Sequence, residues 1–259
     1  MADAPGPLSI EHLRFYRANG YVVVENFLTP AELSGIAAAV DDAYAKHYSH
    51  EHDNLGANPA YDAVFLQKVN LWQVHEGIRR HTFSPRLAAC ARQLLETGSV
   101  RIWHDQTLVK EPNSPPTPFH QDLPYWPMME DTALTAWTAL DDVDERNSCM
   151  QYIPGSQAWG RLSGIDFTSP QGVAEVAPEH AAECVPVSAP VPAGSVVFHH
   201  SLTFHGATAN VTSKRRRAMI VHYMADGTRF NGQEHIVSKI KDLNPGDPMD
   251  DAALWPLCP

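Results

Sequence analysis

The chain has 259 residues, and its 44% of hydrophobic residues is enough for a sizeable core, which excludes a wholly disordered protein. Its formal net charge of −11 argues against nucleic acid or an anionic membrane surface as the main partner. No apolar run approaches the roughly 18 residues of a membrane span, no signal peptide is visible, and the four cysteines form no CxxC pair. We therefore expect a soluble, cytoplasmic protein with neither a cysteine-based zinc site nor a disulfide framework.

The N-terminal part of the chain predicts helices with recognisable start signals. They are expected over residues 8–19, 29–48 and 84–97, with a short strand at 21–24 after the first helix. Thr29, Pro30 and Glu32 stand at the N-cap, N1 and N3 positions, so they form a capping box with a favoured proline. None of these helices carries obvious chemistry, and we expect the segment from about residue 9 to 97 to buttress the rest of the fold.

Short strands dominate from residue 100 onward. They are predicted at Val100–Val109, Pro118–Leu123, Leu134–Leu140, Cys149–Ile153, Ser195–His200 and Arg216–Met224. Turn-forming residues separate them. Helices followed by many short strands predict a mainly β protein, a sandwich or barrel with flanking helices, as one domain over residues 1–259. Residues 161–190 show no steady period and are interpreted as a long loop or lid.

Two side chains of the predicted strand 118–123 suit a metal ion. His120 and Asp122 are two positions apart, and alternation along a strand predicts that they lie on one face and reach one ion together. His205, which follows the strand predicted at 195–200, supplies a third ligand. Two histidines and one carboxylate on neighbouring strands form the facial triad of non-haem Fe(II) oxygenases, which leaves three coordination positions open.

A bidentate 2-oxo acid and O₂ can fill those three positions, and the far carboxylate of the acid then needs a buried cation. Arg216 opens a predicted strand eleven residues after His205. Arginine suits this role because its planar guanidinium matches a carboxylate and does not deprotonate. Arg216 is therefore the predicted partner of the 2-oxo acid.

The basic run 214–217 surrounds this arginine. In a strand Arg215 and Arg217 face away from Arg216, so the run predicts a solvated face around one inward arginine and not a nucleic-acid patch. His222 shares the inward face with Arg216, which places it near the pocket or in the core.

The other histidine groups fit a metal site less well. His50-Glu51-His52 follows a helix end in a polar stretch and is interpreted as a surface feature. His104 and Asp105 point to opposite faces of a strand and cannot easily share an ion. The pair His199-His200 is interpreted as structural or incidental.

Four stretches carry a resemblance to a known family. They are His120–Trp126, Ala136–Leu140, Cys149–Ser156, and His205-Gly206 followed by Asn210 and Arg216. With Phe15-Tyr16 and Gly20–Val24 they span about residues 9 to 224. In these motifs the chain resembles the phytanoyl-CoA dioxygenase family of Fe(II)/2-oxoglutarate-dependent oxygenases.

The resemblance implies a double-stranded β-helix, the cupin-like jelly roll, with Fe(II) and 2-oxoglutarate as cofactors and ascorbate as reductant. It implies that His120, Asp122 and His205 are the iron ligands, and that Arg216 binds the C5 carboxylate of 2-oxoglutarate. Trp137 matches a family tryptophan near the cofactor. Gln106, on the preceding strand, is a further candidate for a polar contact.

The sequence departs from the family pattern at three positions. Ser148 stands where the family often has Gly, and Gln157 stands where it usually has His. Ala207 replaces a serine that often contacts 2-oxoglutarate. Thr208 is the candidate to supply that hydroxyl, although alternation along a strand turns its side chain the other way. Asp122 is present, whereas the family's halogenases lack this carboxylate, so the resemblance implies hydroxylation or a related oxidation.

We expect an enzyme that hydroxylates or otherwise oxidises a small organic molecule with O₂, releasing succinate and CO₂. Tyr125 and Trp126 directly follow the HxD motif, and together with His222 they are the candidates for substrate contacts. The alternative is a metal-binding jelly roll that does not use 2-oxoglutarate, such as a cupin-like isomerase or a sensor. That alternative would have no use for Arg216.

Overall fold

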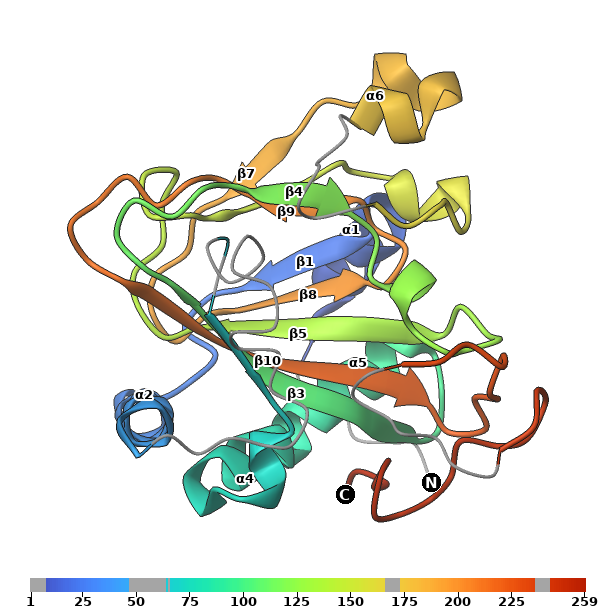
Figure 1. Cartoon of the computed structure of the whole chain (residues 1–259), viewed down its shortest axis with the longest axis horizontal. Helices are drawn as coiled ribbons and strands as arrows, with labels where there is room; N and C mark the ends of the chain where they lie inside the picture. Colours follow the sequence, from blue (N-terminus) through green and yellow to red (C-terminus); the bar gives the residue numbers. More distant parts are fainter. Residues whose placement is uncertain (1–7, 47–63, 65, 166–172, 236–242) are drawn as a thin grey trace.

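A computed structural model of the chain describes residues 8–46, 64, 66–165, 173–235 and 243–259. Two antiparallel sheets face each other in it (Figure 1). The larger sheet has the order β1-β8-β5-β10-β3-β2 and the smaller one the order β4-β9-β6-β7. The predicted fold class, a mainly β jelly roll with flanking helices, is confirmed.

The larger sheet consists of β1 (Tyr21–Val24), β2 (Leu66–Val69), β3 (Val100–Lys110), β5 (Ala133–Ala139), β8 (Val196–His200) and β10 (Arg216–Ala225). The smaller sheet consists of β4 (Thr117–His120), β6 (Met150–Tyr152), β7 (Val187–Ala189) and β9 (His205–Ala207). The longer strands match the predicted ranges to within a residue or two. The short strands β2, β7 and β9 were not predicted.

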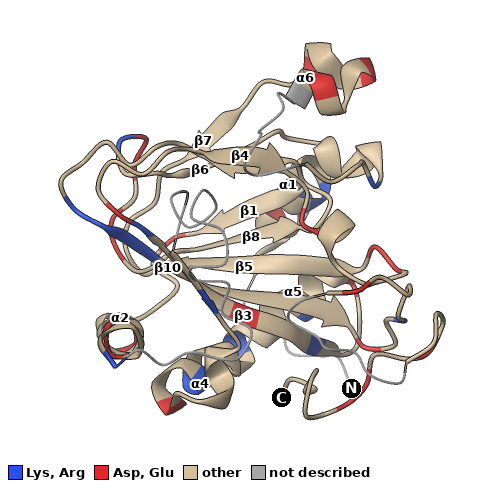
Figure 2. Ribbon diagram, viewed as in Figure 1, with Lys and Arg blue, Asp and Glu red and all other residues tan. Residues whose placement is uncertain are grey.

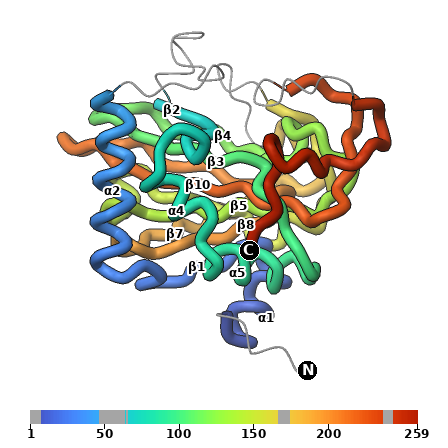
Figure 3. Tube along the Cα trace, turned by 90° about the horizontal axis from the view of Figure 1, so that it is seen from below, coloured from blue at the N-terminus to red at the C-terminus, as the bar shows by residue number. Residues whose placement is uncertain are grey.

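Helices cover the outer face of the larger sheet. They are α1 (Ile10–Asn19), α2 (Pro30–Ala45), α4 (Glu76–Thr82) and α5 (Pro85–Leu95). Figure 3 shows α2, α4 and α5 in front of that sheet. Leu87 of α5 packs in one apolar cluster with Leu134 and Val221 of the sheet, and Val40 of α2 packs in another with Met219.

The helix boundaries follow from their caps. The Thr29 hydroxyl accepts from the backbone N–H of Glu32, and the Glu32 carboxylate accepts from that of Thr29, which confirms the predicted capping box. The predicted helix 84–97 ends two residues early, because Glu96 is left-handed, with φ of 53°. Helix α4 was missed because its N-cap is His75, whose Nδ1 accepts from two backbone N–H groups in place of the usual hydroxyl or carboxylate.

Several short elements connect the sheets. They are the 3₁₀ turns η1 (Leu71–Gln73), η2 (Leu123–Tyr125), η3 (Ser156–Trp159) and η4 (Pro178–Glu183) and the helix α6 (Val173–Val176). Within the segment predicted as a loop or lid, the described residues therefore include α6, η4 and β7, and α6 projects beyond the smaller sheet (Figure 1). Its function as a lid stays a prediction. No helix of the described ranges is long and apolar enough to cross a membrane.

The inner face of the larger sheet carries an ordered row of polar side chains. Antiparallel pairing sets His104 of β3 opposite His222 of β10, His222 opposite Thr135 of β5, Thr135 opposite His199 of β8, and His199 opposite Tyr21 of β1. Directly opposed residues lie on the same face of a sheet. One row across five strands therefore brings three histidines and a threonine into the space between the sheets.

Candidate metal centre

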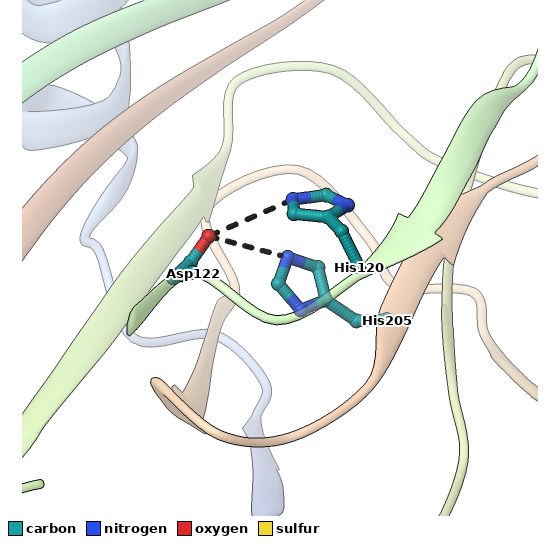
Figure 4. A group of neighbouring side chains, drawn as sticks. All are labelled: His120, Asp122 and His205. Carbon is teal, nitrogen blue, oxygen red and sulfur yellow. Dashed lines mark ion pairs between the residues drawn. The ribbon is translucent and has the colours of Figure 1, made fainter. Parts of the chain in front are cut away.

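Three side chains with metal-binding atoms converge at the edge of the smaller sheet (Figure 4). His120 ends β4 and pairs directly with His205, which begins β9. Asp122 follows two residues after His120, and one ligand atom from each residue lies within 4.8 Å of the other two. Asp122 Oδ1 is 3.6 Å from Nε2 of His120 and 3.7 Å from Nε2 of His205.

The predicted reason for this convergence is wrong for Asp122. β4 ends at His120, and Asp122 has helical dihedral angles, φ −74° and ψ −44°, at the start of η2. It therefore does not share a strand face with His120. The backbone N–H groups of Asp122 and Leu123 both donate to the carbonyl of Ser201, at 2.9 and 3.1 Å, and this turn brings the carboxylate to the two imidazoles.

Both histidines are oriented through their second ring nitrogen. Nδ1 of His120 lies 2.9 Å from the carbonyl of Pro118, and Nδ1 of His205 lies 2.9 Å from the carbonyl of Thr203. A carbonyl only accepts, so each Nδ1 carries the proton and each Nε2 directs a lone pair towards Asp122. Burial lowers the pKa of His205 well below its usual value, which keeps this imidazole neutral, the form that binds metals.

The second oxygen of Asp122 is held by two donors from the polar row. Oδ2 accepts from the hydroxyl of Thr135 at 2.7 Å and lies 3.3 Å from Nε2 of His199. The hydroxyl of Tyr152 lies 3.1 Å from Nδ1 of His199, so it donates there and leaves the proton of His199 on Nε2. Burial opposes ionisation of Asp122, but the surrounding histidines outweigh it and hold the pKa well below its usual range. Oδ1 remains available to a metal.

Arg216 is a buried cation with incomplete hydrogen bonding. Its side chain lies on the inner face, with 2% exposure, and Nη2 donates to the carbonyl and the hydroxyl of Ser148 at 3.0 and 3.2 Å. Nε and Nη1 have no hydrogen-bond partner among the described residues. Burial lowers the pKa of Arg216 to about 10, so the group is charged at neutral pH. A buried charge with unused donors is suited to bind an anion.

The flanking arginines lie on the other face, as predicted. Arg215 binds Asp41 of α2 at 2.7 Å, and Arg217 binds Asp41 at 2.8 Å and Asp141 at 2.6 Å. Figure 2 shows this basic start of β10. Both guanidinium groups therefore already have carboxylate partners.

Of the other cofactor-side candidates, Trp137 lies beside Arg216. The Trp137 ring lies 5.2 Å from the guanidinium carbon, and its Nε1 has no partner in the described part of the chain. Gln106 pairs directly with Ile220 on the inner face and accepts a hydrogen bond from Gln67. Thr208 follows the end of β9, with a buried hydroxyl that has no described partner.

The substrate-side candidates lie next to two histidines, Trp126 beside His222 of the polar row and Tyr125 beside His120. The Trp126 ring lies 5.0 Å from that of His222. Nδ1 of His222 lies 2.8 Å from the hydroxyl of Thr135, which already donates to Asp122, so His222 is the donor. The Tyr125 hydroxyl contacts both the carbonyl and the N–H of Ile165, at 2.8 and 2.6 Å. Its ring lies 6.4 Å from that of His120.

The remaining histidines differ in whether they contact the metal centre. His104 faces inward while Asp105 faces the helices, where it accepts from Thr82 and from the backbone of Trp72, so the prediction that they cannot share an ion is confirmed. His199, of the pair interpreted as structural or incidental, is not incidental, since it is buried and contacts Asp122. The stretch 50–52 lies outside the described residues.

Sequence reasoning missed Thr135, His199 and Tyr152 as supports of the carboxylate. Alternation along their strands could have placed each on an inner face. Their meeting depends on which strands are neighbours, and no local pattern contains that information.

The donor set fits iron and a 2-oxo acid. Two imidazole nitrogens and one carboxylate oxygen form a 2-His-1-carboxylate set. The unused donors of buried Arg216 suit the far carboxylate of the acid.

Comparison with known proteins also indicates an iron- and 2-oxoglutarate-dependent oxygenase. Residues 16–218 match the family described as phytanoyl-CoA dioxygenase (PhyH). The peroxisomal phytanoyl-CoA dioxygenase of Bos taurus is 23% identical in a match that covers 91% of this chain and 76% of that protein.

Two solved structures are similar over almost the whole chain. The non-haem α-ketoglutarate-dependent carbocyclase SnoK from nogalamycin biosynthesis is 31% identical, with a TM-score of 0.82, and the match covers 98% of this chain and 97% of SnoK. The epimerase SnoN, in complex with Fe³⁺, α-ketoglutarate and nogalamycin RO, is 27% identical, with a TM-score of 0.79 and coverage of 95% and 97%.

Proposed function

Because this chain belongs to the phytanoyl-CoA dioxygenase family and is an Fe(II)/2-oxoglutarate-dependent dioxygenase, we propose that it oxidises a C–H bond of a small organic molecule at the centre described above. In this proposal His120, Asp122 and His205 hold the iron, and Arg216 binds the far carboxylate of 2-oxoglutarate. Trp137, Gln106 and Thr208 border the co-substrate. Tyr125, Trp126 and His222 border the substrate.

The observation that carries the assignment is the incomplete hydrogen bonding of Arg216. Its Nε and Nη1 are buried without partners in the described structure, while Nη2 is satisfied by Ser148. A metal-binding jelly roll that does not use 2-oxoglutarate would leave this charge buried and unpaired, which is strongly unfavourable. A dicarboxylate whose other end reaches the iron removes that cost.

The residues of the centre position and polarise the reactants. Bound iron and 2-oxoglutarate supply the oxidative chemistry with O₂, and 2-oxoglutarate leaves as succinate and CO₂. Nε2 of His120, Nε2 of His205 and Oδ1 of Asp122 are oriented as ligands by the hydrogen bonds on their opposite sides. The Trp137 ring packs beside the Arg216 guanidinium.

The product class follows from the same centre. Asp122 occupies the position that the family's halogenases leave for chloride, so we propose hydroxylation or a related oxidation. SnoK and SnoN are named for a ring closure and an epimerisation. We therefore include oxidative ring closure, which also begins at a C–H bond, among the oxidations proposed.

We further propose that ascorbate keeps the iron reduced and that the protein is cytoplasmic. All four cysteines are free, and three of them are buried, which is in keeping with a reducing compartment.

Succinate formation tests the proposal. Purified protein, Fe(II), ascorbate and 2-oxoglutarate are mixed in air with a library of small organic compounds, and succinate is quantified. We expect succinate that depends on iron and rises with a substrate, and we expect none above background from His205→Ala. Iron-dependent succinate at the wild-type rate from His205→Ala would overturn the assignment of the ligand.

A further inference from the structure

Two imidazoles beside the metal centre are not among its three proposed ligands. His104 and His222 are directly opposed on β3 and β10, and their ring centroids are 4.4 Å apart. Both are buried on the inner face, with 4% and 3% exposure. His222 reaches the centre only indirectly, because its Nδ1 donates to Thr135, which in turn donates to Asp122.

The hydrogen bonds of these two rings determine which ring nitrogen carries the proton and which one is free to accept a hydrogen bond. Nδ1 of His222 is used by Thr135, and Nδ1 of His104 lies 3.2 Å from the carbonyl of Asp105, so both Nδ1 atoms are donors. Neither Nε2 receives a hydrogen bond from any described residue. Burial lowers the pKa of His222 to about 4 and that of His104 well below its usual value, so both rings are neutral. Each therefore presents an unused acceptor.

The surroundings of the pair are aromatic. Trp126 lies 5.0 Å from His222, and Trp103 lies 5.7 Å from His104, measured between ring centroids. The indole N–H of Trp103 is buried and has no hydrogen-bond partner in the described part of the chain. Two acceptors and one donor, for which the described residues offer no partner, thus lie among aromatic rings next to the metal centre. A hydroxyl group both donates and accepts, and a ring that carries it can pack against the indoles.

We propose that His104 and His222 form the substrate subsite, an inference that rests on the proposed function. The substrate in this proposal is an uncharged aromatic molecule whose hydroxyl group donates to Nε2 of one of the two imidazoles. An unused acceptor beside the metal centre favours a substrate that carries a hydrogen-bond donor, because a substrate without a donor would bury the acceptor unsatisfied. The hydroxyl contact orients the ring relative to the iron.

Among the described residues, the charges near the subsite argue against a CoA ester. The arginines on the segments that pack around Trp126 are already ion-paired: Arg161 binds Asp131 at 2.6 Å, and Arg229 binds Glu130 at 2.7 Å. A pyrophosphate needs cations that are free to bind it. These two arginines would have to give up their carboxylates first.

The test compares two probes that differ in one hydrogen-bond donor. The full chain is loaded with Fe(II) and 2-oxoglutarate without oxygen, and the binding of 2-naphthol and of 2-methoxynaphthalene is measured by equilibrium dialysis. We expect 2-naphthol to bind about tenfold more tightly, which corresponds to about 1.4 kcal/mol and lies within the range for one hydrogen bond. His222→Phe and His104→Phe should each reduce this ratio and leave the affinity for 2-methoxynaphthalene nearly unchanged.

Three outcomes would overturn the subsite: no binding of 2-naphthol, equal affinity for the two probes, or a ratio that neither variant changes. Tighter binding of decanoyl-CoA than of 2-naphthol would also overturn the substrate class. Failure of the proposed function is separate, because it would appear as loss of the visible absorption of the iron–2-oxoglutarate complex before any probe is added. That absorption also reports whether each variant still forms the complex.

Discussion

The hydroxyl of Thr135 donates to Oδ2 of Asp122 at 2.7 Å, and this contact determines which oxygen of the carboxylate faces the two histidines. Thr135 lies on β5, opposite His199 of β8, so both donors reach the same oxygen from neighbouring strands. Asp122 lies in a turn, but the orientation of its carboxylate is thus determined by side chains of the larger sheet.

Thr135→Val should weaken metal binding. Valine keeps the shape of threonine but removes the donor, so Oδ2 loses one of its two hydrogen bonds. Loss of a group that orients a metal ligand typically costs about 10- to 100-fold in affinity. Calorimetric titration with Fe(II) under nitrogen measures it. Thr135→Ser, which keeps the hydroxyl, is the matched control and should bind Fe(II) nearly as tightly as the wild type. If Thr135→Val bound Fe(II) as tightly as the wild type, the hydroxyl would not position Asp122.

Asp122→Ala should abolish oxidation, because it removes the only carboxylate of the ligand set identified among the described residues. Succinate production is the measurement. Asp131→Ala is a suitable control, since that carboxylate is about half exposed and pairs with Arg161 away from the metal ligands. Turnover by Asp122→Ala would mean that another carboxylate serves.

Stability should depend on pH through Asp105. Burial raises the pKa of this carboxyl to about 7, above its usual value. A carboxyl whose pKa is raised by folding contributes stability below its unfolded pKa, and that contribution is lost as the pH rises through the folded pKa. The free energy of unfolding of the wild type should therefore fall, relative to that of Asp105→Asn, as the pH rises from about 4 to 7. The asparagine stays neutral over this range and keeps an acceptor for the hydroxyl of Thr82.

Urea unfolding of both proteins at several pH values measures that difference. The comparison between variants cancels the buried histidines, which titrate in both. A difference in unfolding free energy that does not change with pH would contradict a raised pKa of Asp105.

Tyr125→Phe should loosen the segment next to the metal centre. The lost hydroxyl holds both the carbonyl and the N–H of Ile165. At about 1 kcal/mol net per hydrogen bond, amide exchange at Ile165 should accelerate about fivefold or more. Hydrogen exchange read by NMR measures it. Tyr44→Phe, which removes a hydroxyl bound to Leu66 and Thr107 on the other side of the larger sheet, should leave the Ile165 amide unchanged.

Strand periodicity was informative where a strand is long and regular. The inward direction of Arg216 and the outward direction of Arg217 follow from alternation, and β10 keeps that alternation from residue 216 to its bulge after His222. The same rule failed at Asp122, because β4 ends two residues earlier. The presence of His120 and Asp122 in one centre was predicted correctly, but for a reason that the backbone does not support.

The remaining features depend on contacts between distant segments. The support of Asp122 by Thr135 and His199 arises from the neighbouring positions of β5 and β8, which are about 60 residues apart in the chain. The pairing of His104 with His222 likewise depends on the register between β3 and β10. Local patterns of sequence do not encode such registers, so these residues could be recognised only in the fold.

The most direct test of the centre is an anaerobic titration of the Fe(II)-loaded protein with 2-oxoglutarate, followed by the visible absorption of the complex. Loss of one partner of a buried charge pair costs roughly 3–5 kcal/mol, so at about 1.4 kcal/mol per tenfold Arg216→Ala should need at least about a hundredfold more 2-oxoglutarate. Arg215→Ala, whose guanidinium pairs with Asp41 on the outer face, should titrate as wild type. An Arg216→Ala variant that still binds Fe(II) and titrates as wild type would contradict the assignment of Arg216.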